Sequence, residues 1–253
     1  MRKNKWLIII FFSLVVFSLT GCAALPESTA PGVTLSVQPD GQPGEVTSGV
    51  QLLVLMTILS LAPAIMVLAT SFTRIVIVIS MVRSAIGTPT IPPNQVVIGL
   101  SLLLTFFIMA PVYNQIDQQA LQPYINEEID QETAFTLAMD PIREFMFKQT
   151  REKDVELFLG LANEPRPDTL ADIPTMTLLP AFVISELRTA FTMGFVLYVP
   201  FLVVDLVVSS ILLSMGMMML PPSLVSLPFK LLLFIMVDGW YLLARSLAMS
   251  FMG

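Results

Sequence analysis

Apolar stretches separated by polar breaks run through most of the chain and predict hydrophobic helices. Four of them, residues 50–75, 96–112, 180–216 and 228–249, carry few charged side chains. An α-helix rises about 1.5 Å per residue, so about 20 apolar residues cross the hydrocarbon core of a bilayer. The pattern therefore predicts an all-α membrane protein built from long helical hairpins.

The third apolar stretch is longer than one crossing requires. From Pro180 to the double proline at 221–222 there are 41 residues, which is about 60 Å as a single helix. We expect Pro200 to kink the helix over 180–216, because an interior proline removes a backbone hydrogen bond. A Met-rich turn over 217–227 then joins it to the last hydrophobic helix.

The first 24 residues have the pattern of a secretory signal peptide. Three basic residues accompany an apolar run of 14 residues, Trp6–Leu19, which is short for a membrane span. Small residues at 21–24 offer a cleavage site. The sequence around Cys22 also resembles a lipoprotein signal, so lipidation of Cys22, its removal and an uncleaved anchor remain alternatives. Residues 25–49 are rich in Pro, Gly, Ser and Thr and predict a flexible periplasmic linker.

The distribution of charge predicts how the helices are oriented. Residues 76–95 contain no acidic residue and follow Arg74, so the positive-inside rule places this loop in the cytoplasm. Residues 113–179 contain 13 acidic and 5 basic residues. We expect this acidic segment on the opposite, periplasmic side, which agrees with the signal peptide.

The acidic segment 113–179 has the pattern of a helical region. Asp140 precedes Pro141, as an N-cap residue precedes a proline at the first helical position. Apolar residues follow at helical spacing and form one stripe. We expect a helix that begins at Asp140 and packs against copies of itself, because so short a segment makes only a small core.

Composition excludes several classes of function. Only 13% of the residues are charged, about half the value typical of soluble domains. The chain has no His and one Cys, which excludes most zinc sites, His-based catalysis and an internal disulfide. A net charge of −6 argues against nucleic acid as a partner. We therefore predict no enzyme activity, no metal and no cofactor.

The turn at the end of the long hairpin holds four Met within residues 215–219. Methionine is unbranched and polarizable, so a cluster of its side chains adapts to partners of many shapes. In a single copy these residues form only an apolar turn. If several copies face a common axis, Met217, Met218 and Met219 form a ring that excludes ions and yields to a polypeptide.

Six charged residues lie inside the last two hydrophobic helices, and four of them are candidates for a role in packing or assembly: Glu186, Asp205, Lys230 and Asp238. Such charges are costly in a membrane and face an interior, a partner or a water-filled path. Antiparallel folding about the Met-rich turn brings Lys230 within one helical turn of Asp205. We predict an ion pair between them, within one subunit or between neighbours, with a role in packing or assembly.

Glu186 lies opposite no basic residue of the same hairpin. Its expected partner is Arg188, Arg245 of another copy, or a different protein. A proton relay through Asp205 and Asp238 is the functional alternative to packing.

Several sequence blocks resemble those of one family. They lie at 70–75, 87–89, 92–95, 104–109, 145–146, 149–152, 185–187, 217–219, 221–222, 227–230 and 237–240. From about residue 50 onward the chain resembles the FliP/SctR family of type III secretion export-gate proteins, and its signal peptide resembles the flagellar branch. The linker over 25–49 and the lipoprotein-like signal do not match the family pattern.

The resemblance implies a pore-forming subunit of the flagellar type III export gate, which passes unfolded flagellar subunits across the bacterial inner membrane at the basal body. It also implies a multimeric helical pore made from several copies with FliQ and FliR, FlhA and FlhB as neighbours, and FliO as an assembly helper. Met217, Met218 and Met219 match the family's methionine gasket. An ion channel or proton-coupled carrier subunit is the alternative interpretation.

Overall fold

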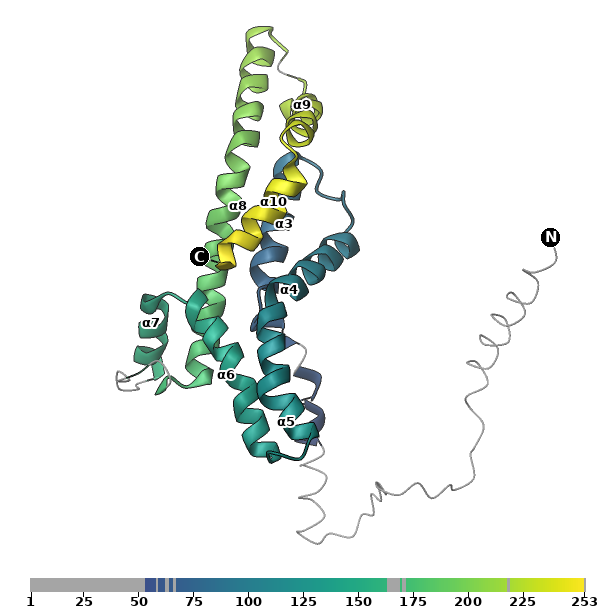
Figure 1. The fold of residues 1–253 in the computed structure, drawn as a ribbon. Helices are drawn as coiled ribbons and strands as arrows, with labels where there is room; N and C mark the ends of the chain where they lie inside the picture. Colours follow the sequence, from purple (N-terminus) through teal and green to yellow (C-terminus); the bar gives the residue numbers. More distant parts are fainter. Residues whose placement is uncertain are drawn as a thin grey trace, which may run out of the picture. The chain divides into compact units, whose positions relative to one another are not determined.

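The computed structural model describes residues 53–252, except 58, 62–63, 66, 163–168, 170–171 and 218. The predicted signal peptide and the linker over 25–49 lie outside the described residues. Within the described part every regular element is helical (Figure 1). The elements are α3 (Phe72–Ile86), α4 (Asn94–Ile116), the π-helical turn η1 (Asp117–Leu121), α5 (Gln122–Ile125), α6 (Gln131–Gln149), α7 (Glu152–Ala162), α8 (Thr175–Ser214), α9 (Pro222–Met236) and α10 (Gly239–Met252).

The 40-residue helix α8 is the element on which the others assemble. Helix α3 packs along it, α7 and α6 contact it toward its N-terminal end, and α9 folds back on it after the Met-rich turn (Figure 1). A length of about 60 Å follows from the rise per residue. Pro180 and Pro200 both lie inside this helix, which continues past each of them.

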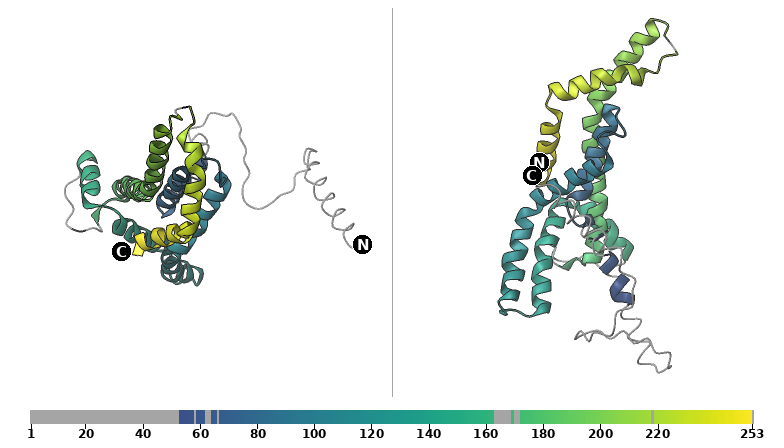
Figure 2. Two further views of the ribbon diagram at one scale, coloured as in Figure 1. Left: turned by 90° about the horizontal axis from the view of Figure 1, so that it is seen from above. Right: turned by 90° about the vertical axis from the view of Figure 1, so that its right-hand side faces the viewer.

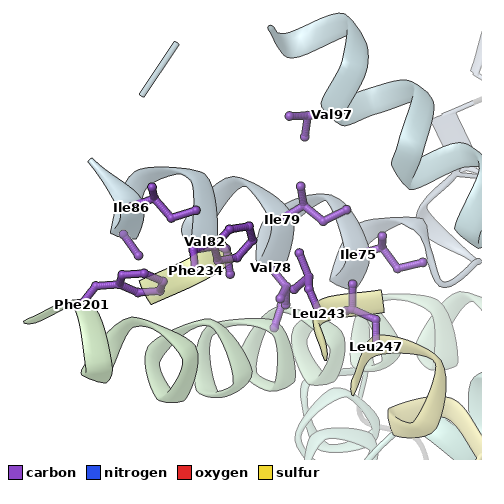
Figure 3. Packing of buried hydrophobic residues seen from close by; sticks show 12 residues of the cluster. Ile75, Val78, Ile79, Val82, Ile86, Val97, Phe201, Phe234, Leu243 and Leu247 are labelled. Carbon is purple, nitrogen blue, oxygen red and sulfur yellow. The ribbon is translucent and has the colours of Figure 1, made fainter. Parts of the chain in front are cut away.

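The main apolar core lies between α3, α4, α8, α9 and α10 (Figure 3). Its α3 residues recur three and four positions apart, which places them on one face of the helix. The core is completed by Val97 of α4, Ala190 and Phe201 of α8, Phe234 of α9, and Leu243 and Leu247 of α10. The α3 members of the cluster are Ile75, Val78, Ile79, Val82, Ala85 and Ile86.

A second apolar core joins α6 and α7 to the N-terminal part of α8. It contains Met146 of α6, Val155 and Leu159 of α7, and Phe182 of α8, all buried. Helices α4 and α6 lie side by side and are connected through η1 and α5 (Figure 2). The apolar stripe of the acidic segment therefore packs on α8 within one subunit, whereas the sequence pattern predicts that it packs against copies of itself.

The structure extends helix where the sequence pattern predicts a loop. Helix α3 continues to Ile86 and ends at Gly87, whose φ of 90° and N–H bond to Ser84 close the last turn. The sequence interpretation ended the first hydrophobic helix at residue 75 because charges follow it. Arg83 lies in the last turn of α3, because arginine is a good helix former, and its guanidinium donates to the carbonyl oxygen of Pro92 over 3.1 Å.

The cap of helix α6 lies ten residues before the predicted one, so the expectation for Asp140 is wrong. Asp130 is the N-cap residue, and its side chain accepts a hydrogen bond from the backbone N–H of Thr133 over 3.3 Å. Pro141 lies buried inside the helix. With Asp130 as the cap, the first turn of α6 is regular and its Thr133 N–H is bonded. Pro141 then lies in the helix interior, where it lacks one backbone donor.

Two helical stretches are long and apolar enough to cross a membrane, Asn94–Ile125 and Thr175–Ser214. Helices α9 and α10 become a third if they are counted as one span, but they meet at a bend of 63°. Many apolar side chains on α4, α8 and α9 are exposed in the single subunit. These features define an all-α membrane protein.

Candidate functional site

The Met-rich turn is built by a helix stop followed by a helix start. At the end of α8, Gly216 N–H donates to Leu213 and Met217 N–H donates to Leu212, each over 3.0 Å. Together with a φ of 72° at Gly216, this is the Schellman motif. Pro221 then serves as the N-cap residue of α9, with Pro222 at its first position.

The methionines of this turn extend away from the subunit's own core. The Met219 side chain is 98% exposed and that of Met217 is 39% exposed, while Met218 lies outside the described residues. Exposed methionines on a turn held by backbone hydrogen bonds are available to contact a neighbouring molecule. The single subunit does not enclose a pore with them.

An apolar groove of about 440 Å³ lies next to this turn, between α8 and α9. All of its lining side chains are aliphatic or aromatic. They are Val203, Val204, Val207, Val208, Ile211, Leu212, Val225 and Phe229. The groove therefore favours an apolar occupant.

The predicted ion pair between Asp205 and Lys230 is confirmed, and it forms within one subunit. Lys230 Nζ lies 2.6 Å from Asp205 Oδ2, and Ser226 Oγ donates to Asp205 Oδ1 over 2.6 Å. Lys230 also donates to the carbonyl oxygen of Ala85 over 3.1 Å. One lysine of α9 thus connects α8 with the C-terminal end of α3.

The expectation for Glu186 is wrong, because its partner is Arg74 of α3 rather than Arg188 or Arg245. The two side chains form a bidentate ion pair in which Arg74 Nε donates to Glu186 Oε2 over 2.9 Å, and Nη2 contacts Oε1. Glu186 is 0% and Arg74 2% exposed. The prediction sought a partner for Glu186 by folding α8 against α9. The cation instead comes from α3, in the first hydrophobic region.

Sequence reasoning missed Arg74 as a site residue, although the signal was present. Arg74 stands among apolar residues within a helix, the setting in which a charge faces an interior or a partner. The sequence interpretation used it only to orient the adjacent loop. Its buried position shows that a cation at the end of an apolar stretch also needs to be tested as a partner for a distant carboxylate.

A second polar cluster, also missed, joins α7 to α8 beside Glu186. The hydroxyl of Ser185 donates to the Asp154 carboxylate and accepts from the backbone N–H of Arg151 over 3.1 Å. Arg151 Nη2 lies 2.6 Å from Asp154 Oδ2. This cluster fixes the start of α7 on α8, so it has a positioning role for the acidic segment.

Asp238 lies at the bend between α9 and α10 rather than inside a helix. Its φ is 51°, a left-handed conformation that Asp tolerates better than most residues. Its carbonyl oxygen accepts from Leu242 N–H over 3.1 Å. In the described residues no ion pair involves its side chain, so Asp238 contributes backbone geometry to the joint.

The fold and the site are those of an all-helical membrane protein. Its longest hairpin ends in an exposed Met-rich turn and contains buried ion pairs. Comparison with known proteins then gives the family. A model of the FliP family matches residues 55–247, which is most of the chain. The protein belongs to the FliP family.

Individual relatives agree with this assignment. The flagellar biosynthetic protein FliP of Bacillus subtilis (strain 168) is 54% identical over 217 residues, covering 86% of this chain and 98% of the relative. That of Pectobacterium carotovorum is 52% identical over 221 residues, covering 87% and 85%. The Treponema denticola protein of the same name is 41% identical over the full length of both chains.

Proposed function

We propose that this chain is a pore-forming subunit of the flagellar type III protein-export gate, which passes unfolded flagellar subunits across the bacterial inner membrane. The observation that carries the proposal is the exposed Met-rich turn at the end of the α8–α9 hairpin. The chain belongs to the FliP family, and its relatives are named flagellar biosynthetic proteins, which supports the link to the flagellum.

The gate is proposed to form when several copies bring their Met-rich turns to one axis. Met217, Met218 and Met219 then close the pore against ions and deform around a passing polypeptide. The apolar groove lined by α8 and α9 offers a surface on which a neighbouring copy can bury apolar side chains. The same interpretation gives the exposed apolar faces of α4 and α8 a partner, either another subunit or lipid.

The proposed partners follow from the family resemblance. They are further copies of this chain, FliQ and FliR in the same complex, FlhA and FlhB as neighbours, and FliO during assembly. The proposed orientation places the loop between α3 and α4 in the cytoplasm and the acidic helices α6 and α7 in the periplasm. The proposed location is the inner membrane at the flagellar basal body.

The buried charges are proposed to fix packing rather than to carry protons. Both oxygens of Asp205 are occupied within the subunit, one by Lys230 and one by Ser226. Asp238 lies elsewhere in the fold, at the joint between α9 and α10. A relay through these two carboxylates therefore has no supporting geometry, and the alternative of a proton-coupled carrier is not favoured.

The experiment replaces Met217, Met218 and Met219 together by Ala in cells. Small-ion leakage, flagellin export and recovery of the assembled complex are measured in the same strains. We expect a recovered complex that leaks ions and still exports. A matched control replaces Met176, which is also exposed but lies on the first turn of α8, and should not leak. A recovered triple variant that does not leak contradicts the proposal.

A further inference from the structure

Arg74 has a second set of partners in the last turn of α10. Its Nη1 donates to the carbonyl oxygen of Ser250 over 2.9 Å and to the Ser250 hydroxyl over 3.0 Å. The ring centroid of Phe251 lies 3.8 Å from Arg74 Cζ, a cation–π contact. Gln149 of α6 donates to the carbonyl oxygen of Phe251 over 3.4 Å. Side chains of two other helices therefore hold the end of α10.

The five N–H donors of Arg74 are all used. Nε and one N–H of Nη2 bind Glu186, the two of Nη1 bind Ser250, and the second of Nη2 binds Gln149 Oε1 over 2.9 Å. No other side chain presents so many donors in one plane. The guanidinium therefore joins α3, α6, α8 and α10 at one buried point.

The contact with Ser250 also completes a helix end. The last four carbonyl groups of a helix have no intrahelical partner and carry partial negative charge. Helix α10 has no basic residue in its own last turn. Arg74 supplies that cation from α3. The carbonyl group of Ser250 therefore has this donor only when α10 is docked on Arg74.

The other end of α10 is joined tightly to α9. A Cβ on Gly239 would lie 2.2 Å from two ring carbons of Phe234, so that ring fills the space beside the joint. Phe234 also meets Trp240 edge to face, with centroids 5.4 Å apart. Because the joint is packed, the placement of α10 constrains the C-terminal end of α9, while the N-terminal end of α9 carries the Met-rich turn.

We propose that Arg74 is the positioning residue of the C-terminal arm α10, and that its docking sets the position of α9 and hence of the Met-rich turn. Lys230 and Ser226 hold α9 on Asp205 of α8, and the docked arm adds an attachment at the C-terminal end of α9. The docking itself is independent of the proposed function, whereas its consequence for the gate rests on that function.

The test uses variants that alter the α10 side and leave the Arg74–Glu186 pair in place. Phe251→Leu removes, at nearly constant volume, the ring that contacts Arg74 and stacks on Phe145 with centroids 6.1 Å apart, and Phe251→Tyr retains both contacts. Removal of residues 250–253 takes away the whole contact, and removal of 252–253 is the matched control. Each change is made in the full chain with Cys22→Ser, which removes its one cysteine.

Docking is followed by thiol labelling of Leu247→Cys, at a site on α10 that is 0% exposed. Tyr241→Cys, at an exposed site on the same helix, is the labelling control. We expect Phe251→Leu and removal of 250–253 to speed labelling at position 247 about tenfold. Phe251→Tyr and removal of 252–253 should leave the labelling rate unchanged. Equal effects of Leu and Tyr at position 251 would overturn the contribution of the Phe251 ring, and an unchanged labelling rate after removal of 250–253 would overturn docking through Arg74.

Ion leakage is measured in the same strains. We expect Phe251→Leu, but not Phe251→Tyr, to leak from a recovered complex. Faster labelling without leakage overturns the link between α10 and the Met-rich turn. If removal of 250–253 prevents recovery of the complex, the comparison of Phe251→Leu with Phe251→Tyr in labelling and leakage tests the proposal. Failure of the proposed gate function can be distinguished from failure of the docking proposal. In the first case the triple Met variant does not leak, while thiol labelling still reports docking.

Discussion

Lys230 of α9 donates to the carbonyl oxygen of Ala85 in α3 over 3.1 Å, in addition to its ion pair with Asp205. Ala85 lies in the last turn of α3, where carbonyl groups have no intrahelical partner. The lysine thus serves acceptors on two helices. An exchange of Asp205 and Lys230 would place a carboxylate near the Ala85 carbonyl, so the exchange tests more than the ion pair.

Removal of one partner of this pair is expected to cost more than removal of both charges. Lys230→Met leaves the partly buried Asp205 carboxylate without a cation, at a cost of about 3–5 kcal/mol in unfolding free energy. The double variant with Asp205→Asn should recover most of that loss, because no buried charge remains and Ser226 still has an acceptor. Thermal unfolding of the purified protein in detergent measures both.

Export by the same double variant separates packing from proton transfer. A relay needs titratable groups, and the double variant has none at this position. We expect flagellin export to follow recovery of the complex, so the double variant exports better than Lys230→Met alone. A fully recovered complex without export would return the proton-coupled alternative to consideration.

Close packing of α8 on α3 requires a glycine at position 194. A Cβ there would lie 2.4 Å from Met81 Sδ and 3.2 Å from Met81 Cβ. We expect Gly194→Ala to destabilise the protein by about 1–3 kcal/mol through overpacking. Met81→Ala in the same chain should restore part of the loss. Gly99→Ala on α4 is the control, because a Cβ at that position meets nothing within 4 Å, and a stability no lower than that of the parent is expected there.

The joint between α9 and α10 is expected to be sensitive to residue type at two positions. Asp238→Asn should be tolerated, because Asn adopts the left-handed conformation readily, whereas Asp238→Val should be destabilising. Gly239→Ala should clash with Phe234. Thermal unfolding ranks the three variants, and an Asp238→Val protein as stable as Asp238→Asn would contradict the strain argument.

The first turn of α6 is expected to loosen in acid. Hydrogen bonds from Thr133 hold the pKa of the Asp130 carboxyl below its usual value. Because the folded pKa is the lower one, the cap is fully effective above the unfolded value of about 3.9 and is lost as the pH falls through the folded pKa. Amide hydrogen exchange in residues 131–135, corrected for intrinsic rates, measures the effect. Asp130→Asn should remove the pH dependence.

The local pattern predicted the features that depend on neighbouring residues. The Asp205–Lys230 pair followed from folding two consecutive apolar helices about a marked turn, which fixes the register within about one helical turn. The double proline marked that turn, because proline favours a helix start. The family resemblance, carried by short blocks in order, was likewise a property of the sequence.

The tertiary structure alone decided which distant charge meets Glu186. Positions 74 and 186 are 112 residues apart, and no periodicity relates them; their contact exists because α3 packs along α8. The start of α6 after Asp130 was also beyond the pattern, which placed the cap at Asp140, a residue that lies inside the helix. The sequence by itself thus determined the apolar helical stretches, the turn chemistry and the family, because these depend on local backbone preferences and composition. Packing determined where the buried cations lie, because a charge in an apolar helix is stable only where another helix brings its acceptors.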